Sequence, residues 1–154
     1  MTIVNRRMML EDVPAVHGID LQSFSLPWSE RSFRYEMTDN PVARGWVAEM
    51  DGRVVAMLVL WQILDEAHIA TIATLPEFRR RGIGERLLIE ALMAAREEGA
   101  RRAFLEVRAG NLAAQKLYKK YGFTAAGVRP HYYKDNNEDA ILMDLDDLNS
   151  LEVR

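Results

Sequence analysis

A run of arginines and glycines at residues 79–84 has the composition of an anion-binding turn. The run follows an apolar stretch rich in β-branched residues, precedes a segment of helical periodicity, and reads Arg79-Arg80-Arg81-Gly82-Ile83-Gly84. The first N–H groups of a helix have no partner inside the helix, and the helix dipole favours negative charge there. Glycine lets a backbone approach a ligand closely. The pattern therefore predicts a phosphate-binding turn between a strand and a helix.

Two common phosphate-binding motifs do not match this run. A Walker A loop needs Gly-Lys-Ser/Thr, and a dinucleotide fingerprint needs a third glycine where Leu87 stands. The remaining spacing, Arg/Gln-x-x-Gly-x-Gly/Ala, resembles the acetyl-coenzyme A pyrophosphate loop of the GNAT acetyltransferase superfamily. From the residues alone, a solvated basic loop with a glycine turn is the alternative.

Further segments extend the resemblance from about Ile3 to Leu145. They are Phe24-Ser25-Leu26-Pro27-Trp28-Ser29, Leu105-Glu106-Val107-Arg108-Ala109-Gly110-Asn111, Ala113-Ala114-Gln115-Lys116-Leu117-Tyr118, Tyr121-Gly122-Phe123, Tyr132-Tyr133 and Glu138-Asp139-Ala140. Together they resemble the RimI branch of GNAT enzymes, which acetylate the N-terminal alanine of a ribosomal protein.

The resemblance implies an acetyl-coenzyme A-dependent N-acetyltransferase. Its acceptor would be the N-terminal α-amine of a protein, that of an alanine in a small-subunit ribosomal protein. This amine would attack the acetyl group directly in a ternary complex. The alternatives are a broader N-terminal or small-amine acetyltransferase and, from another class, a non-catalytic acyl-coenzyme A sensor.

Glu106 interrupts an otherwise apolar strand pattern, Ala103-Phe104-Leu105-Glu106-Val107. A carboxylate on a central strand is costly unless it is hydrated or paired. In a partly dry cleft we expect the pKa of Glu106 to rise toward a range useful for taking a proton from an amine. From this residue alone, a structural ion pair with Arg108 explains the carboxylate equally well. The match of Leu-Glu-Val-Arg-x-x-Asn to the family implies that Glu106 is the catalytic base.

Acetyl transfer is also helped by a proton for the leaving thiolate. Tyr118 is the candidate acid, because a phenol with an ordinary pKa of about 10 is protonated at neutral pH. Ala114, Leu117, Tyr118 and Tyr121 share an apolar helix face, so an ordinary core tyrosine is the alternative. The family's Leu-Tyr position implies Tyr118 rather than Tyr121 as the acid, beside the cofactor.

The remaining cofactor contacts also follow from the resemblance. It implies that residues 79–84 bind the pyrophosphate and that Asn111 contacts the pantetheine arm. Asn111 precedes a helical stretch, so we also expect it to cap that helix. Three strand residues should offer the pantetheine their backbone groups, as an added half-strand would: Ile72, Ala73 and Thr74.

Three further side chains are candidates for the site, with open roles. His68 lies on the expected cofactor strand, where related N-terminal acetyltransferases can use a histidine as a second base. Tyr132 and Tyr133 lie in a region that borders the substrate's first residues in the family. Strand alternation puts these tyrosines on opposite faces, so at most one should line the cleft unless a bulge intervenes.

The elements that must position these residues mix strands and helices. We expect strands over about 3–8, 44–50, 53–62, 67–75, 102–108, 124–132 and 140–145, and helices from about 12, after 29, over 82–98 and over 111–121. Asp12 should cap the first helix, and Asp51-Gly52 should turn a hairpin. This order predicts a three-layer α/β sandwich around a mixed sheet. The resemblance implies that strands 67–75 and 102–108 part to admit coenzyme A.

Composition fits this interpretation. The 154 residues are 49% hydrophobic, carry a net charge of −3 and include no cysteine, and they show no repeat or linker. We therefore expect one domain over residues 1–154, with no disulfide, no metal centre and no general attraction to nucleic acid. The apolar runs are too short to span a bilayer, and the N-terminus lacks a signal-like apolar segment, so a cytoplasmic protein is expected.

Overall fold

Seven strands form one mixed sheet in the order β1-β2-β3-β4-β5-β7-β6. The computed structural model describes residues 2–151; residue 1 and residues 152–154, which belong to the expected domain, lie outside the described residues. All neighbouring strands are antiparallel except β4 and β5, which are parallel. The strands are β1 (Ile3–Arg7), β2 (Ala43–Met50), β3 (Arg53–Ile63), β4 (Glu66–Thr74), β5 (Arg102–Arg108), β6 (Thr124–Tyr133) and β7 (Glu138–Leu145).

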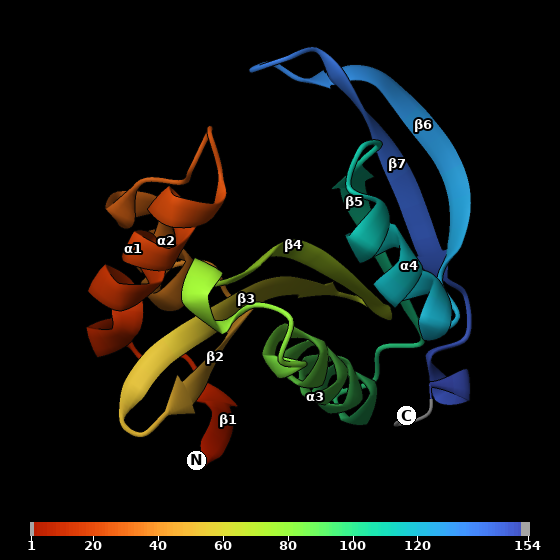
Figure 1. Cartoon of the computed structure of the whole chain (residues 1–154). Coiled ribbons are helices and arrows are strands. Elements are labelled where there is room, and N and C mark those ends of the chain that lie inside the picture. The colour runs from red at the N-terminus through yellow and green to blue at the C-terminus, as the bar shows by residue number, and fades with distance from the viewer. Residues whose placement is uncertain (1, 152–154) are drawn as a thin grey trace.

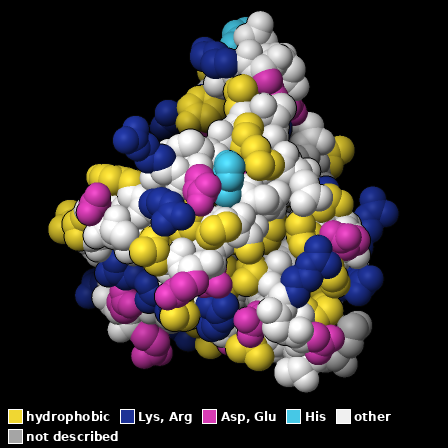
Figure 2. All heavy atoms as spheres, turned by 90° about the vertical axis from the view of Figure 1, so that its left-hand side faces the viewer, with side chains coloured by type: hydrophobic (Ala, Val, Ile, Leu, Met, Phe, Trp, Pro, Cys, Tyr) yellow, Lys and Arg dark blue, Asp and Glu magenta, His cyan; other side chains and the backbone are white. Residues whose placement is uncertain are grey.

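Helices cover both faces of this sheet and complete the predicted sandwich. They are α1 (Val13–Ser23), α2 (Glu30–Thr38), α3 (Ile83–Glu97) and α4 (Leu112–Lys120), with short 3-10 turns at Leu10–Asp12, Pro76–Phe78 and Leu148–Ser150. Helices α1 and α2 lie on one face of β2, β3 and β4, and α3 lies on the other (Figure 1). On the side of α1 and α2, acidic, basic and apolar side chains are interspersed (Figure 2). That face therefore presents no single-sign charged patch.

Helix α3 shows why the sequence pattern was informative. The apolar residues that give this segment its helical periodicity are all buried: Ile83, Leu87, Leu88, Ala91, Leu92 and Ala95. They recur at helical spacing because α3 is the crossover between the parallel strands β4 and β5 and must pack on the sheet. Gly99 follows the helix with a φ of 104°, as expected for a glycine that ends it.

The hairpin between β2 and β3 is confirmed. Asp51 and Gly52 have φ values of 50° and 84°, the two positive values that a tight type I′ turn requires. This turn sets the register that brings β3, and through it β4, to the centre of the sheet.

The start of α1 differs from the prediction. Asp12 makes no cap hydrogen bond to the helix. Its carboxylate instead accepts hydrogen bonds from the Met9 N–H at 2.7 Å and from the Arg6 guanidinium at 2.7 and 2.9 Å. The inner face of α1 carries Val13, Val16, Ile19 and Asp20, whereas Leu21 is 55% exposed.

Candidate active site

The strands β4 and β5 part halfway along their length. They pair only from Glu66 with Arg102 to Ile69 with Leu105. On the other edge of β4, Val59 pairs with Thr71 and Leu60 with Ile69, so Ala70 is an extra residue that forms a bulge. Bulges bend a strand and re-aim its side chains. The parting that the resemblance implied for strands 67–75 and 102–108 is therefore present.

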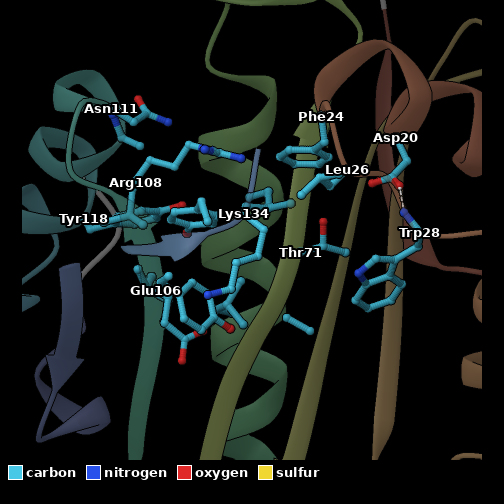
Figure 3. A pocket seen from close by; sticks show the side chains of 18 residues that line it. Asp20, Phe24, Leu26, Trp28, Thr71, Glu106, Arg108, Asn111, Tyr118 and Lys134 are labelled. Carbon is cyan, nitrogen blue, oxygen red and sulfur yellow. Dashed lines mark hydrogen bonds between the residues drawn. The ribbon is translucent and has the colours of Figure 1, made fainter. Parts of the chain in front are cut away.

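A cavity of about 620 Å³ opens where the strands part (Figure 3). Residues 69–72 of β4 form one wall and residues 105–108 of β5 form the other. The α1–α2 connection, α4 and the β6–β7 hairpin enclose it with Phe24, Leu26, Trp28, Asn111, Ala114, Tyr118, Tyr132, Tyr133 and Lys134. Asp20 of α1 also reaches it.

Glu106 lies in this cavity and faces His68 across the parting strands. The Glu106 Oε2 and His68 Nε2 atoms are 3.3 Å apart, and the two side chains are 20% and 19% exposed. Aromatic neighbours hold the imidazole in place. It stacks on the Phe104 ring with 4.7 Å between ring centres, and it meets the Trp61 ring edge-on with 5.4 Å between ring centres. The fixed imidazole in turn fixes one oxygen of the Glu106 carboxylate.

Two sequence-based expectations about Glu106 are wrong. Its pKa is lowered rather than raised, because the hydrogen bond from His68 favours the carboxylate more than burial disfavours it. Its ion-pair partner is also not Arg108. The Arg108 guanidinium binds Asp135 at 3.0 Å and Glu138 at 3.3 Å and lies 4.0 Å from the centre of the Tyr133 ring.

The two tyrosines at the end of β6 both line the cavity. The pairing of β6 with β7 is irregular between Arg129 and Tyr133, and His131 has a positive φ of 54° within this stretch. The irregularity breaks the strict alternation of faces. Tyr132 and Tyr133 meet with their rings nearly perpendicular, 5.2 Å apart, and close one side of the cavity.

Tyr118 and Tyr121, the two candidate acids, have different surroundings. Tyr118 is 6% exposed, lines the cavity from α4, and has its pKa raised to about 12 by burial. It is therefore protonated throughout the physiological range, as a proton donor must be. The Tyr121 hydroxyl donates to Glu85 outside the cavity.

Asn111 caps α4 as predicted. Its side-chain oxygen accepts a hydrogen bond from the Ala114 N–H at 3.2 Å, and the residue also lines the cavity. Of the three β4 residues expected beside the pantetheine, Ile72 lines the cavity. Ala73 is 9% exposed and belongs to the core, and neither it nor Thr74 is in the cavity wall.

The 79–84 turn follows β4 and leads into α3, beyond the cavity itself. Within residues 2–151, the N–H groups of residues 80–85 donate to no backbone oxygen, so they are free to bind an anion. Gly82 has a φ of 75°, and a Cβ added to Gly84 would lie 3.0 Å from Thr74 Oγ1. These features fit a pyrophosphate cradle.

The three arginines of this turn differ in their contacts. Arg79 donates to the Thr74 carbonyl at 2.9 Å and to Ser23 Oγ at 3.2 Å, so it joins the end of β4 to the end of α1. Arg81 lies over the Phe78 ring at 5.2 Å. Arg80 has a positive φ of 63°.

Comparison with known proteins decides the family. The model of the Acetyltransferase (GNAT) family matches residues 13–123. The chain belongs to the GNAT family of acetyltransferases. As a GNAT enzyme it is an acetyl-coenzyme A-dependent N-acetyltransferase.

Several GNAT relatives match nearly the whole chain. It is 44% identical over 138 residues to a Bacillus subtilis (strain 168) protein provisionally named a [ribosomal protein bS18]-alanine N-acetyltransferase, covering 90% of this chain and 91% of that protein. It is 35% identical to the Escherichia coli (strain K12) [ribosomal protein bS18]-alanine N-acetyltransferase, over 87% and 90% of the two chains. The crystal structure of the Escherichia coli ribosomal-protein-S18-alanine N-acetyltransferase superposes with a TM-score of 0.87 and 32% identity, covering 94% of this chain and 93% of that one.

Sequence reasoning about this GNAT enzyme missed several cavity residues. No local pattern singled out Asp20, and Arg108 was considered as an ion-pair partner for Glu106. Two sequence signals were available for these residues. Asp20 is a carboxylate next to the apolar positions of α1, and the acidic Asp135 and Glu138 follow later in the chain as possible partners for Arg108.

Among residues 2–151 no helix has the length and apolar character needed to cross a membrane, and no group of side chains is suited to hold a metal ion.

Proposed function

We propose that this chain acetylates the N-terminal alanine of a small-subunit ribosomal protein of the bS18 type, in the cytoplasm. Supporting this substrate are the names of the Bacillus subtilis and Escherichia coli relatives, at 44% and 35% identity over most of each chain. The observation that carries the proposal is the cavity between the parted strands, which both Glu106 and Tyr118 line.

We assign Glu106 the role of general base. Its pKa is lowered, so the carboxylate is ionised at neutral pH, although it is a weaker base than an ordinary glutamate. It can still take the proton because the nitrogen becomes much more acidic as it bonds to the acetyl carbon. As the nitrogen of the substrate forms a bond to the acetyl carbon, the nitrogen loses its proton to Glu106, directly or through one water. The His68 hydrogen bond holds the carboxylate in place for this transfer.

We assign Tyr118 the role of general acid. When the bond between the acetyl carbon and sulfur breaks, the sulfur leaves with the electron pair and takes the Tyr118 hydroxyl proton. Burial keeps that proton on Tyr118 in the resting enzyme, so the hydroxyl is available as a donor to the sulfur as negative charge develops there. The two proton transfers leave an amide, a thiol, a protonated Glu106 and an ionised Tyr118, which solvent returns to their starting states.

The cosubstrate would lie along the parted edge of β4. The free N–H groups at residues 80–85 would hold the pyrophosphate, with Arg79, Arg80 and Arg81 around it. Residues 72–74 would offer backbone groups, and Asn111 and Tyr118 would face the pantetheine arm. Acetyl-coenzyme A supplies the activated acetyl group, and the chain positions the amine against it.

A peptide panel tests this function. Peptides beginning with alanine, serine, methionine or proline, and an N-terminally blocked peptide with an internal lysine, would be incubated with enzyme and acetyl-coenzyme A. We expect mass spectrometry to find one acetyl group on the alanine and serine α-amines and almost none on lysine, whose pKa of about 10.4 leaves far less neutral amine than an α-amine of about 7.7–8.0. Acetylation of all free N-termini alike would favour a broader N-terminal acetyltransferase. Acetylation of none of the peptides by an enzyme that binds coenzyme A would favour a non-catalytic sensor.

A further inference from the structure

Asp20 is an unusually buried carboxylate. It is 1% exposed, whereas the other buried acids, Asp12 and Glu36, are each 8% exposed. Asp12 pairs with Arg6, and Glu36 accepts hydrogen bonds from the Trp61 and Asn40 side chains.

Asp20 has fewer polar partners than these acids to offset the cost of burying its carboxylate. It makes no ion pair within residues 2–151, and its carboxylate accepts one hydrogen bond, from the Trp28 N–H at 2.6 Å. Burial raises the pKa of Asp20. The Trp28 hydrogen bond and the charge of nearby His17 lower it by less, so the net shift is upward. A carboxylate kept at such a cost is a candidate for a functional role.

Both ends of the α1–α2 connection are tied to this one residue. The Phe24 N–H donates to the Asp20 backbone carbonyl at 3.1 Å, and the Trp28 N–H donates to the Asp20 carboxylate. Residues 24–28 have no regular secondary structure, so these bonds set the shape of the connection. Apart from them, Ser25 hydrogen-bonds Asp135 on the β6–β7 turn.

The connection forms the apolar wall of the cavity opposite β5. Phe24, Leu26 and Trp28 project from it into the cavity (Figure 3). Trp28 also stacks on Trp61 at 6.5 Å, and Trp61 meets His68, the partner of Glu106. A shift of the connection would therefore change the space beside Glu106.

We propose that Asp20 is a positioning residue for the peptide substrate. This proposal rests on the proposed function. Asp20 fixes residues 24–28 so that Phe24, Leu26 and Trp28 hold the first residue of the substrate against Glu106. The pyrophosphate turn lies outside this cavity, and Asn111 and Tyr118, which would face the pantetheine arm, lie on the side of the cavity opposite Asp20 and Trp28 (Figure 3). Asp20 therefore acts on peptide binding more than on cosubstrate binding.

Asp20→Ala and Asp20→Asn separate this role from general stabilisation. The alanine variant loses the acceptor for the Trp28 N–H, whereas asparagine keeps one oxygen of the same reach, loses the charge and carries an NH₂ group in place of the second oxygen. We expect Asp20→Ala to raise the KM for an alanine peptide by about tenfold, to accept larger first residues, and to keep the KM for acetyl-coenzyme A. Asp20→Asn should restore most of the peptide KM. Asp146→Asn, at an exposed position, is the matched control.

The outcomes are distinguishable. A folded Asp20→Ala enzyme with unchanged peptide KM and unchanged first-residue preference overturns the role of Asp20 and leaves the proposed function intact. Wild-type enzyme that modifies no peptide overturns the proposed function and, with it, this proposal.

The wild type provides a test that needs no variant. The backbone amide signal of Trp28 in nuclear magnetic resonance spectra should shift when an alanine peptide binds and exchange its hydrogen more slowly. An unmoved signal at saturating peptide contradicts the proposal, even where Asp20→Ala fails to fold.

Discussion

His68 on β4 and Glu106 on β5 form a hydrogen-bonded pair at the point where their strands separate. Phe104, the residue that pairs with His68 in the parallel ladder, stacks on its ring, and Glu106 follows two residues later on the same face of β5. The parting of the strands thus creates the cavity and, at its closed end, supplies the carboxylate with a hydrogen-bonding partner. A base that is ionised, oriented and half-buried results from this backbone geometry.

Replacing Glu106 with glutamine should remove the base and keep the shape. General base catalysis is worth about 10²–10⁴-fold, so we expect kcat to fall within that range. The deficit should shrink as pH rises, because more of the amine is then already neutral. Steady-state kinetics from pH 6 to 9 would measure it, and calorimetry should find unchanged coenzyme A affinity. Near-normal kcat at neutral pH would make Glu106 a structural carboxylate and His68 the next candidate.

Tyr118→Phe should remove a proton donor and leave cofactor binding intact. A leaving thiol that is more acidic needs a proton less, so the defect should be smaller with such an acyl donor than with acetyl-coenzyme A. Comparing kcat for the two donors in variant and wild type measures this difference. Tyr121→Phe, which alters the tyrosine bonded to Glu85, is the matched control. Equal defects with both donors would argue against Tyr118 as the acid.

Replacing His68 with leucine should raise the Glu106 pKa. The charge of Arg129 also lowers the Glu106 pKa. The other titratable groups that line the cavity with Glu106 are Tyr133, Tyr132, Tyr118, Arg108, Lys134 and Asp20. In the wild type the folded pKa lies below the unfolded value, so ionised Glu106 adds stability above about pH 4.3 that is lost as pH falls through the folded pKa. Without the His68 hydrogen bond, burial dominates and this contribution should disappear. A ¹³C titration of the Glu106 carboxyl measures the change, and an unmoved midpoint would show that His68 is not its cause.

Substituting Gly82 with valine should weaken coenzyme A binding strongly, because a side chain strains the positive φ of 75° and distorts the N–H cradle. Gly99 is a matched control, since its φ is 104° and a Cβ there also meets nothing within 4 Å, but it lies at the far end of α3. Arg80→Ala should cost less affinity, because an exposed charge contributes modestly. Calorimetry that finds equal affinities for Gly82→Val, Gly99→Val and wild type would refute the cradle.

Local patterns predicted the scaffold well and the site only in part. The inner face of α3, the Asp51-Gly52 turn and the Asn111 cap depend on residues close in sequence, so they were readable. The His68–Glu106 bond joins residues 38 positions apart. It lies beside the bulge at Ala70, and no local pattern indicated either feature. That bond also reversed the expected direction of the Glu106 pKa shift.

Asp20 and the two tyrosines of β6 illustrate the same limit. The partner of Asp20 is a backbone N–H beyond an irregular connection, so its identity depends on tertiary structure. Tyr132 and Tyr133 both face the cavity because β6 is irregular before them, where simple alternation allowed only one.

The most direct test of the central claim uses the ribosomal protein itself. Purified, unacetylated bS18 would be incubated with acetyl-coenzyme A and either wild-type enzyme or Glu106→Gln, and its N-terminal peptide analysed by mass spectrometry. We predict one acetyl group on the alanine α-amine with wild type and a rate lower by about 10²–10⁴-fold with the variant. Unmodified bS18 under conditions where the wild type consumes acetyl-coenzyme A with another amine, or acetylation confined to lysine side chains, would contradict the claim.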